Sequence, residues 1–318
     1  MIVTVTPNPA LDVTYRVPEL QPGEVHRVRE VLVRAGGKGV NVARVLQQLG
    51  EPCVAVGLGG GPDGRRLVAG LREAGLQVDF PEELPDVRRT LVVHAQGQVT
   101  SFWEPGPEPL DPPRAAQALL DAVQARLGTA RAVTVSGSLP PRVDPELPAR
   151  IARLCAERQV PVVLDLDGDP LRAAVATDGA VLMPNADELE VLAGQRPRTP
   201  REAAVLAAHL VRGGSGPSPA AVVVTLGEQG AVAVTDTGSV AARPVDRVSG
   251  NTAGAGDAAC AAVARALAVA GSVRAVDLRT LVADAVAVSA AAVLRPVAGE
   301  IDVNAARRWR GEICVEDL

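Results

Sequence analysis

Apolar residues run without interruption in six short segments of the chain. Continuous runs of β-branched and small apolar residues are typical of strands that are buried on both faces of a parallel sheet. We therefore expect strands at residues 2–6, 54–58, 132–136, 160–165, 180–183 and 221–226. Between these runs the apolar residues recur at helical spacing. This spacing predicts helices at residues 39–49, 64–74, 113–127, 145–158 and 201–211.

The alternation of these strands and helices predicts an α/β fold. Consecutive strand–helix–strand units form right-handed crossovers, so the strands lie parallel and helices cover both faces of the sheet. The sequence after Gly250 is mostly helical in pattern. We expect residues 1–318 to form a single domain, a three-layer αβα sandwich with a mostly parallel central sheet.

Two pairs of strand-like segments interrupt this alternation. Residues 13–17 and 25–33 form one pair, and residues 89–95 and 98–103 form the other, joined by a turn at Gln96 and Gly97. We expect both pairs to build a small β-sheet lid over the mouth of the main domain, from insertions at about residues 13–33 and 88–104. The alternative is that they extend one edge of the main sheet.

The composition excludes several classes of partner. Among 318 residues, 47% are hydrophobic and 22% are charged, which is ordinary for a globular protein. The 32 basic and 37 acidic residues leave a net charge of −5, so the whole chain offers no positive field for nucleic acid or an anionic membrane. The N-terminus lacks the plan of a secretory signal, and no apolar run approaches the roughly 20 residues that span a bilayer. We expect a cytoplasmic protein that binds neither nucleic acid nor membrane.

The segment NTAGAGD at residues 251–257 precedes a long helical run. Glycines in such a loop allow successive backbone amides to converge where a helix begins, and we expect an anion hole at Gly254, Ala255 and Gly256. Asp257 falls in the first helical turn, where it is placed to accept a proton from a substrate hydroxyl. A helix cap without a ligand is the simpler alternative. A dinucleotide-binding loop is excluded, because Asp277, at the distance of the usual acidic residue, lies in helical sequence.

A second glycine-rich segment, AGGKGVN, surrounds the only lysine of the chain, Lys38. Lysine is a compact point charge, whereas arginine is a broad planar fork, so a single retained lysine indicates a narrow anionic contact. Gly37 permits close approach of the backbone to a ligand, and Asn41 offers hydrogen bonds to hydroxyl groups. A helix-start loop without a ligand is again the alternative. The segment is not a P-loop, because Gly39 follows Lys38 where that motif requires serine or threonine.

Six motifs occur in a fixed order along the chain: TPNPALD at residues 6–12, GGKGVN at 36–41, SGSLPP at 136–141, PNADE at 184–188, TLGEQG at 225–230 and NTAGAGD at 251–257. Together they closely resemble the ribokinase-like sugar kinases of the PfkB family. Within that family they are similar to the branch of 1-phosphofructokinase and tagatose-6-phosphate kinase. The resemblance covers essentially the whole chain and implies a ribokinase-like fold.

The resemblance also implies roles for individual residues. Asp257 matches the catalytic base, and Gly254, Ala255 and Gly256 match the anion hole for the transferred phosphoryl group. Glu188 matches a residue linked to Mg²⁺ through water or phosphate. Arg89 matches a phosphate-binding cation, with its neighbour Arg88 as the alternative. The remaining matches are sugar-phosphate contacts at Asp12, Gly37, Lys38, Asn41 and Ser138 and nucleotide contacts at Asn185, Thr225, Gly227 and Gly230.

The activity implied by the resemblance is transfer of the γ-phosphoryl group of ATP, with Mg²⁺, to a primary hydroxyl of a ketohexose phosphate. Conversion of fructose 1-phosphate to fructose 1,6-bisphosphate is the first expectation, and tagatose 6-phosphate and fructose 6-phosphate are the alternative substrates. A non-catalytic sugar-phosphate or nucleotide-binding protein is the alternative from a different class, because Met183 stands where relatives often have lysine. We also expect a homodimer that forms through the small sheet.

Overall fold

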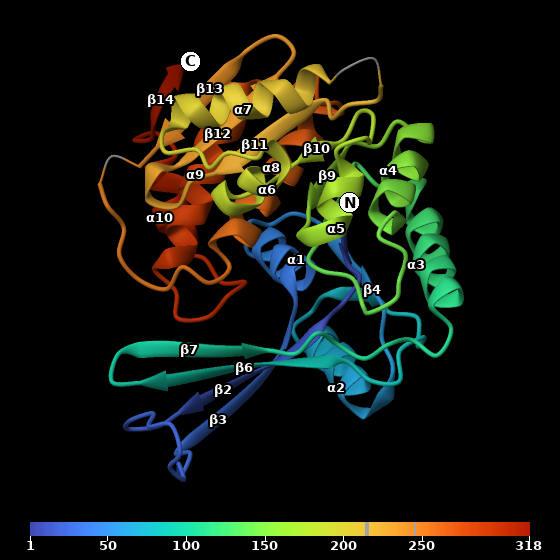
Figure 1. Cartoon of the computed structure of the whole chain (residues 1–318), viewed down its shortest axis with the longest axis vertical. Helices are drawn as coiled ribbons and strands as arrows, with labels where there is room; N and C mark the ends of the chain where they lie inside the picture. Colours follow the sequence, from blue (N-terminus) through green and yellow to red (C-terminus); the bar gives the residue numbers. More distant parts are fainter. Residues whose placement is uncertain (214–215, 245) are drawn as a thin grey trace.

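The computed structural model describes residues 1–213, 216–244 and 246–318. Its centre is a ten-stranded sheet (Figure 1). The seven strands from β5 to β11 pair in parallel, whereas β12, β13 and β14 continue the sheet in antiparallel pairing. In spatial order they are β5 (Gln77–Asp79), β4 (Cys53–Gly57), β1 (Ile2–Thr6), β8 (Ala132–Ser136), β9 (Val162–Asp165), β10 (Val181–Leu182), β11 (Ala221–Thr225), β12 (Ala231–Thr235), β13 (Ser239–Arg243) and β14 (Cys314–Asp317).

The predicted buried strands are confirmed. Strands β1 and β8 are buried along their entire lengths and pair with each other in parallel register. Apolar side chains point to both faces of these strands, so both faces must be covered by helices. The mostly parallel α/β sandwich expected from the sequence is therefore the observed fold.

Helices cover the sheet in two layers, each with its own apolar core. One layer contains α1 (Lys38–Gln48), α8 (Ala255–Ala270), α9 (Leu278–Val293) and α10 (Val303–Trp309). The other contains α2 (Gly61–Glu73), α3 (Pro112–Leu127), α4 (Leu147–Glu157), α5 (Gly168–Ala174), α6 (Ala186–Ala193) and α7 (Pro200–Arg212). The buried faces of α8 and α9 are rich in alanine, which lets these two helices pack closely. No helix of the described ranges is long and apolar enough to cross a membrane.

The strand pairs expected outside the main fold form a separate four-stranded sheet, so the alternative of an extended main sheet is excluded. Its strands lie in the order β3 (Glu30–Gly36), β2 (Ala10–Arg16), β6 (Arg88–Ala95) and β7 (Gln98–Trp103). Gln96 and Gly97 both have positive φ angles, as the predicted two-residue turn between β6 and β7 requires. Figure 1 shows this small sheet projecting below the main body.

Candidate active site

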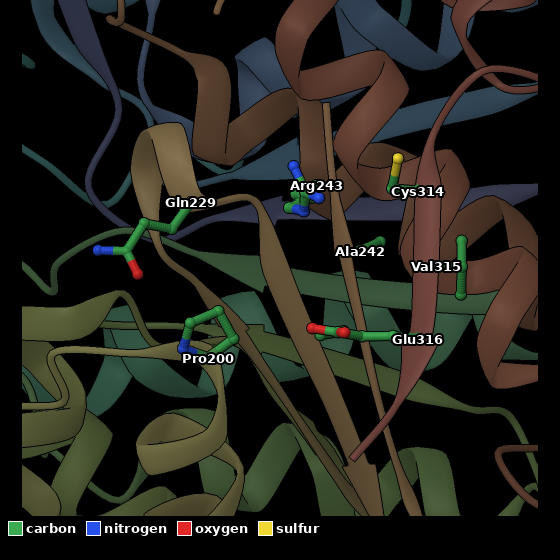
Figure 2. A pocket seen from close by; sticks show the side chains of 8 residues that line it. Pro200, Gln229, Ala242, Arg243, Cys314, Val315 and Glu316 are labelled. Atoms are coloured by element: carbon green, nitrogen blue, oxygen red, sulfur yellow. The ribbon is translucent and has the colours of Figure 1, made fainter. Parts of the chain in front are cut away.

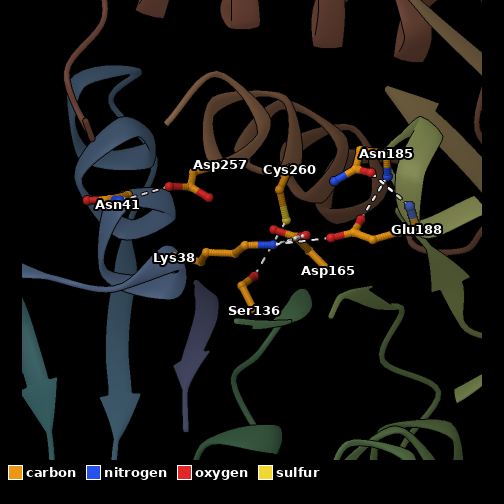
Figure 3. Close-up of polar contacts among 8 residues, drawn as sticks. All are labelled: Lys38, Asn41, Ser136, Asp165, Asn185, Glu188, Asp257 and Cys260. Atoms are coloured by element: carbon orange, nitrogen blue, oxygen red, sulfur yellow. Dashed lines mark hydrogen bonds and ion pairs between the residues drawn. The ribbon is translucent and has the colours of Figure 1, made fainter. Parts of the chain in front are cut away.

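Polar side chains gather at the carboxyl ends of the parallel strands, where ligands bind in open α/β sheets. Asp165 is the last residue of β9, Asn185 follows β10, and Ser138 follows β8. The amino-terminal ends of α1 and α8 bring Lys38, Asn41 and Asp257 to the same place (Figure 3). Residues from five separate parts of the chain thus share one site.

Asp257 lies in the first turn of α8 and is only 6% exposed. Asn41 donates a hydrogen bond of 2.8 Å from Nδ2 to Oδ2 of Asp257. Burial, and then the negative charge of Asp165, raise the pKa of Asp257 to about 7, although Lys38 and Asn41 act in the opposite direction. A carboxyl group with a pKa near neutrality exchanges protons readily at physiological pH, as a general base must.

The residues of the expected anion hole lie at the start of α8. Gly254 has φ +81°, and a Cβ atom there would lie 2.8 Å from the Cβ of Ala298, so this position requires glycine. Of the expected anion hole, the Ala255 amide donates to the carbonyl of Thr252 at 3.2 Å. The amide of Gly256 has no acceptor among the described residues, and a side chain at Gly256 would meet only open space. The amides of Gly254 and Gly256 are therefore the two that have no acceptor among the described residues.

Lys38 lies between carboxylates. Its Nζ donates to Oδ1 of Asp165 at 3.0 Å and lies 4.0 Å from Oε1 of Glu188. Burial opposes the positive charge, but the carboxylates of Asp165, Glu188 and Asp257 outweigh burial and raise the pKa of Lys38. Lys38 is thus firmly protonated and lies between Asp165 and Glu188 of the expected nucleotide motif.

The motif of Asn185 and Glu188 forms a capping box at the start of α6. The Glu188 amide donates to Oδ1 of Asn185 at 2.9 Å, and the Asn185 amide donates to Oε2 of Glu188 at 2.8 Å. Glu188 therefore uses one carboxylate oxygen as a cap and directs the other toward Lys38. Burial raises the pKa of Glu188, and Lys38 opposes this shift.

The other expected nucleotide contacts follow β11. Thr225 forms a parallel bridge with Asn185, so these two residues lie side by side. Gly227 begins the short 3-10 helix η1 (Gly227–Gln229), and Gly230 ends it. A Cβ on Gly230 would lie 1.9 Å from the carbonyl oxygen of Ala242, so the tight approach of β13 explains this glycine.

Asp12 lies on β2 of the small sheet, directly over Gly36. A Cβ on Gly36 would fall 2.1 Å from Oδ2 of Asp12, so the carboxylate occupies the space that only a glycine leaves open. Burial raises the pKa of Asp12 to about 6, opposed by the charge of Arg88, a hydrogen bond from Thr90 and the charges of Arg44 and Arg34. Asp12 therefore lies in a positively charged corner of the site.

The structure distinguishes the two neighbouring arginines on β6. Arg88 influences Asp12, and its Nε donates to the carbonyl of Asn8 at 3.2 Å. Arg89 points to the opposite face of the strand, as alternation requires, and its guanidinium pairs with Asp63 at 2.6 Å. The structure thus places Arg88 beside Asp12, and Arg89 on the opposite face of β6, where it pairs with Asp63.

Gly37 and Ser138 complete the expected substrate contacts. Gly37 precedes α1 with φ +107°, and a Cβ there would lie 2.8 Å from Cγ2 of Thr6. Ser138 accepts a hydrogen bond of 3.2 Å at Oγ from Nδ2 of Asn8. Both lie where β1 and β8 end, next to the base of the small sheet.

Three residues of the site were not predicted from the sequence: Asp165, Arg44 and Asn8. Asp165 carries one usable signal, its place at the end of a buried strand, because such ends form the site in this fold class. Arg44 is only 8% exposed and lies one turn after Asn41 in α1. Asn8 stands inside the TPNPALD motif, but nothing in the sequence shows which segments its side chain joins.

Two cavities of the described chain lie away from this cluster. One of about 230 Å³ lies between α7, β13 and β14 and is lined by Gln229, Arg243, Cys314 and Glu316, among others (Figure 2). Another, of about 240 Å³, lies beside the loop that leads to Gly254 and is lined by Val248, Ala290 and Leu294, among others. The converging charged groups, and not cavity size, identify the candidate active site.

The chain is similar to known carbohydrate kinases in sequence and in fold. The sequence matches the pfkB family of carbohydrate kinases over residues 8–304. The fold is similar to phosphofructokinase-2 from Escherichia coli in complex with fructose 6-phosphate, with a TM-score of 0.86, 28% identity and coverage of 98% of each chain.

Two more distant structures show the same fold. A Thermotoga maritima protein described as a possible 1-phosphofructokinase has a TM-score of 0.82 and 24% identity, with coverage of 100% of this chain and 99% of that one. A ribokinase from Arabidopsis thaliana, bound to ribose and ATP, has a TM-score of 0.72 and 22% identity, with coverage of 97% and 98%. The ribokinase-like fold expected from the motifs is confirmed.

Proposed function

Because this chain belongs to the pfkB family of carbohydrate kinases, we propose that it phosphorylates a ketohexose phosphate at a primary hydroxyl with ATP. The chain is a sugar kinase, a phosphotransferase with an alcohol group as acceptor. The observation that carries the proposal is the position of Asp257, a buried carboxyl with a pKa of about 7 in the first turn of a helix. The neighbouring Gly256 amide has no acceptor among the described residues. Membership in a family of kinases argues against the alternative of a non-catalytic binding protein.

In the proposed reaction the substrate hydroxyl lies against Asp257. Asp257 takes the hydroxyl proton as the oxygen forms its bond to the γ-phosphorus of ATP, while the bond from that phosphorus to the bridging oxygen breaks and ADP leaves. Asn41 holds the carboxylate in place through its hydrogen bond of 2.8 Å. Phosphoryl transfer depends mainly on positioning and electrostatic stabilisation, so these fixed groups supply most of what the protein contributes.

Two groups of this chain are proposed to stabilise the negative charge of the phosphates, a backbone amide and a side-chain ammonium. The Gly256 amide at the start of α8 has no acceptor among the described residues and is available to an anionic oxygen. The Lys38 ammonium lies among Asp165, Glu188 and Asp257, where we propose that it binds the phosphates of ATP. This assignment differs from the expected contact of Lys38 with the phosphate of the sugar, because its ion pairs lie on the side of Asn185 and Glu188.

The residues present fit a magnesium ion. Mg²⁺ is usually bound through one or two carboxylates together with substrate phosphates and water. Asp165 and Glu188 offer hard carboxylate oxygens beside the proposed ATP phosphates, whereas the described residues contain no cluster of three metal-ligating side chains. When bound, Mg²⁺ neutralises phosphate charge. We propose Asp165 and Glu188 as its contacts, with Glu188 acting through water or phosphate.

The nucleotide is proposed to lie along the ends of β10 and β11. Asn185, Thr225, Gly227 and Gly230 form the proposed contacts, and the bridge between Asn185 and Thr225 supports placing them together. The cavity that includes Val248, Ala290 and Leu294 is proposed to hold the adenine ring, because these apolar side chains adjoin the loop that leads to Gly254. Met183, two residues before Asn185, is only 3% exposed and packs in the core.

Fructose 1-phosphate is the proposed substrate, on the motif resemblance to the 1-phosphofructokinase branch. Asp12, Gly37 and Asn41 are proposed to bind its hydroxyls, and Arg88 and Ser138 its phosphate. Fructose 6-phosphate is the second candidate, favoured by the similarity to the E. coli enzyme crystallised with that sugar. Tagatose 6-phosphate remains the third. ADP release measured with Mg-ATP and each sugar tests the proposal, and turnover on none of them would contradict it.

Two expectations about the wider context stay predictions. Cytoplasmic location is one. The other is assembly: one E. coli phosphofructokinase-2 structure is described as a tetrameric inhibited form, and we propose that this chain dimerises through its small sheet. Apolar side chains exposed on the two faces of that sheet support the proposal, namely Val31, Leu32, Val99, Phe102 and Trp103.

A further inference from the structure

Asn8 is a buried polar residue at the base of the small sheet. It follows β1 and is only 2% exposed. Its Nδ2 donates to the carbonyl of Pro105 at 2.9 Å, to Oγ of Ser138 at 3.2 Å and to the carbonyl of Leu139 at 3.2 Å. Pro105 follows the last strand of the small sheet, whereas Ser138 and Leu139 follow β8 of the main sheet. One amide group therefore joins the two sheets.

The backbone of Asn8 also fixes Arg88. Its carbonyl accepts a hydrogen bond of 3.2 Å from Nε of Arg88, and the carbonyl of Glu104 accepts one of 3.2 Å from Nη1. Arginine has five N–H donors, so others remain for a ligand. Arg88 and Ser138, one a cation and the other a hydroxyl, are thus held by the same residue at a fixed separation.

Burial of the Asn8 side chain costs free energy, and this cost supports a specific role for the residue. Its Oδ1 is buried and has no hydrogen-bond partner among the described residues. A Cβ on Gly106 would lie 2.5 Å from that oxygen, and Gly106 has φ +95°, so the chain accepts a restricted position to make room for the amide. Buried polar atoms without partners are rare and call for an explanation, and substrate positioning supplies one here.

We propose that Asn8 is a positioning residue for the sugar phosphate: it does not touch the substrate but aligns Ser138 and Arg88 so that both bind the same phosphate group. This inference rests on the proposed function. Truncation of Asn8 removes its hydrogen bond to the Ser138 hydroxyl and weakens the link between the two sheets. The affinity for the phosphorylated end of the sugar should therefore fall. The proposed ATP contacts near Lys38 and Asp165 should stay unchanged.

The test is steady-state kinetics of Asn8→Ala with the phosphorylated sugar, with ATP and with the same sugar lacking phosphate. We expect the KM for the sugar phosphate to rise about tenfold or more, as the loss of one or two hydrogen bonds to a charged group predicts. The KM for ATP and the slow turnover of the unphosphorylated sugar should change less than about twofold. A KM for the sugar phosphate that stays at the wild-type value would overturn the inference.

A matched control separates positioning from general destabilisation. Leu120→Ala removes a side chain that is 4% exposed in α3, a helix that contains none of the site residues. It should lower the unfolding temperature without changing the ratio of activities on phosphorylated and unphosphorylated sugar. If Asn8→Ala affects all three substrates equally, as lost folded protein would, its role is structural and the inference fails.

A double-mutant cycle with Ser138→Ala tests the pathway through Ser138. If Asn8 acts through that hydroxyl, the double variant should bind the sugar phosphate more tightly than two independent losses predict. Fully multiplicative losses would contradict it. Asn8→Ser, which keeps a small polar side chain, replaces Asn8→Ala in the same cycle if the alanine variant does not fold. A wild-type protein inactive on every ketohexose phosphate would overturn the proposed function itself, whereas an active wild type with an unaffected Asn8 variant overturns only this inference.

Discussion

Asn41 and Asp257 are 216 positions apart in the chain, yet Nδ2 of Asn41 lies 2.8 Å from Oδ2 of Asp257. The bond connects the first turn of α1 to the first turn of α8, so the two glycine-rich motifs form one site. One carboxylate oxygen is held by Asn41, which leaves the other oxygen for a substrate. The proposed base is therefore oriented before any ligand binds.

Removal of this base gives the first prediction. Asp257→Asn should lower kcat by roughly 10²–10⁴-fold, the usual contribution of a general base. The variant should fold and should unfold at a higher temperature than wild type at pH 8, because the buried carboxylate with its raised pKa no longer has to be ionised. Thermal unfolding at pH 8 and steady-state turnover check both points, and near-wild-type turnover would remove Asp257 from the mechanism.

The second prediction concerns pH. Asp257 must be ionised to accept a proton, so kcat/KM should rise with pH and level off above about 7. Lys38 lowers the pKa of Asp257, so in Lys38→Met the pKa rises and the acidic limb moves to higher pH. The pH profiles of the two proteins provide the measurement. An acidic limb at the same pH in both would show that Lys38 does not act on the base.

The third prediction separates the two arginines of β6. Arg88→Ala should raise the KM for the sugar phosphate by about tenfold or more, since a charged hydrogen-bonding partner is lost. Arg89→Ala should change that KM less than about twofold, because the Arg89 guanidinium pairs with Asp63 on the exposed face, and exposed pairs contribute little. The reverse order of effects would place the phosphate on the opposite face of the small sheet.

The fourth prediction concerns assembly. Trp103 is 76% exposed on the last strand of the small sheet. A charge introduced there should prevent burial of this surface against a second copy, so Trp103→Glu should convert a dimer into a monomer. Light scattering after gel filtration gives the mass, and Val269→Glu, an exposed apolar position on α8, is the control. A wild-type monomer, or a Trp103→Glu dimer, would contradict the proposed interface.

Much of the fold could be predicted because its signals are local. Strands β1 and β8 are recognisable in the sequence as continuous apolar runs. Strands β12 and β13, Ala231–Thr235 and Ser239–Arg243, were not predicted, because short alanine-containing segments fit several structures equally well. Their pairing with β11 is decided by the sheet that they extend.

The site depended more on tertiary structure. Motifs located Asp257, Lys38 and Asn41, but the partner of Lys38 is Asp165, 127 positions away in an ordinary strand sequence. The choice between Arg88 and Arg89 likewise required the pairing of β2 with β6, in which Asp12 lies opposite Thr90. Since side chains alternate along a strand, Arg88 shares the face of Thr90 and Asp12, and Arg89 does not.

The most direct test of the central claim is release of ADP from Mg-ATP at pH 8, measured with fructose 1-phosphate, fructose 6-phosphate, tagatose 6-phosphate, fructose and ribose, for wild type and Asp257→Asn. We predict rapid turnover of one phosphorylated ketohexose, with fructose 1-phosphate first, and its loss in Asp257→Asn. Turnover of an unphosphorylated sugar alone, or equal rates in the two proteins, would contradict a sugar-phosphate kinase that uses Asp257 as its base.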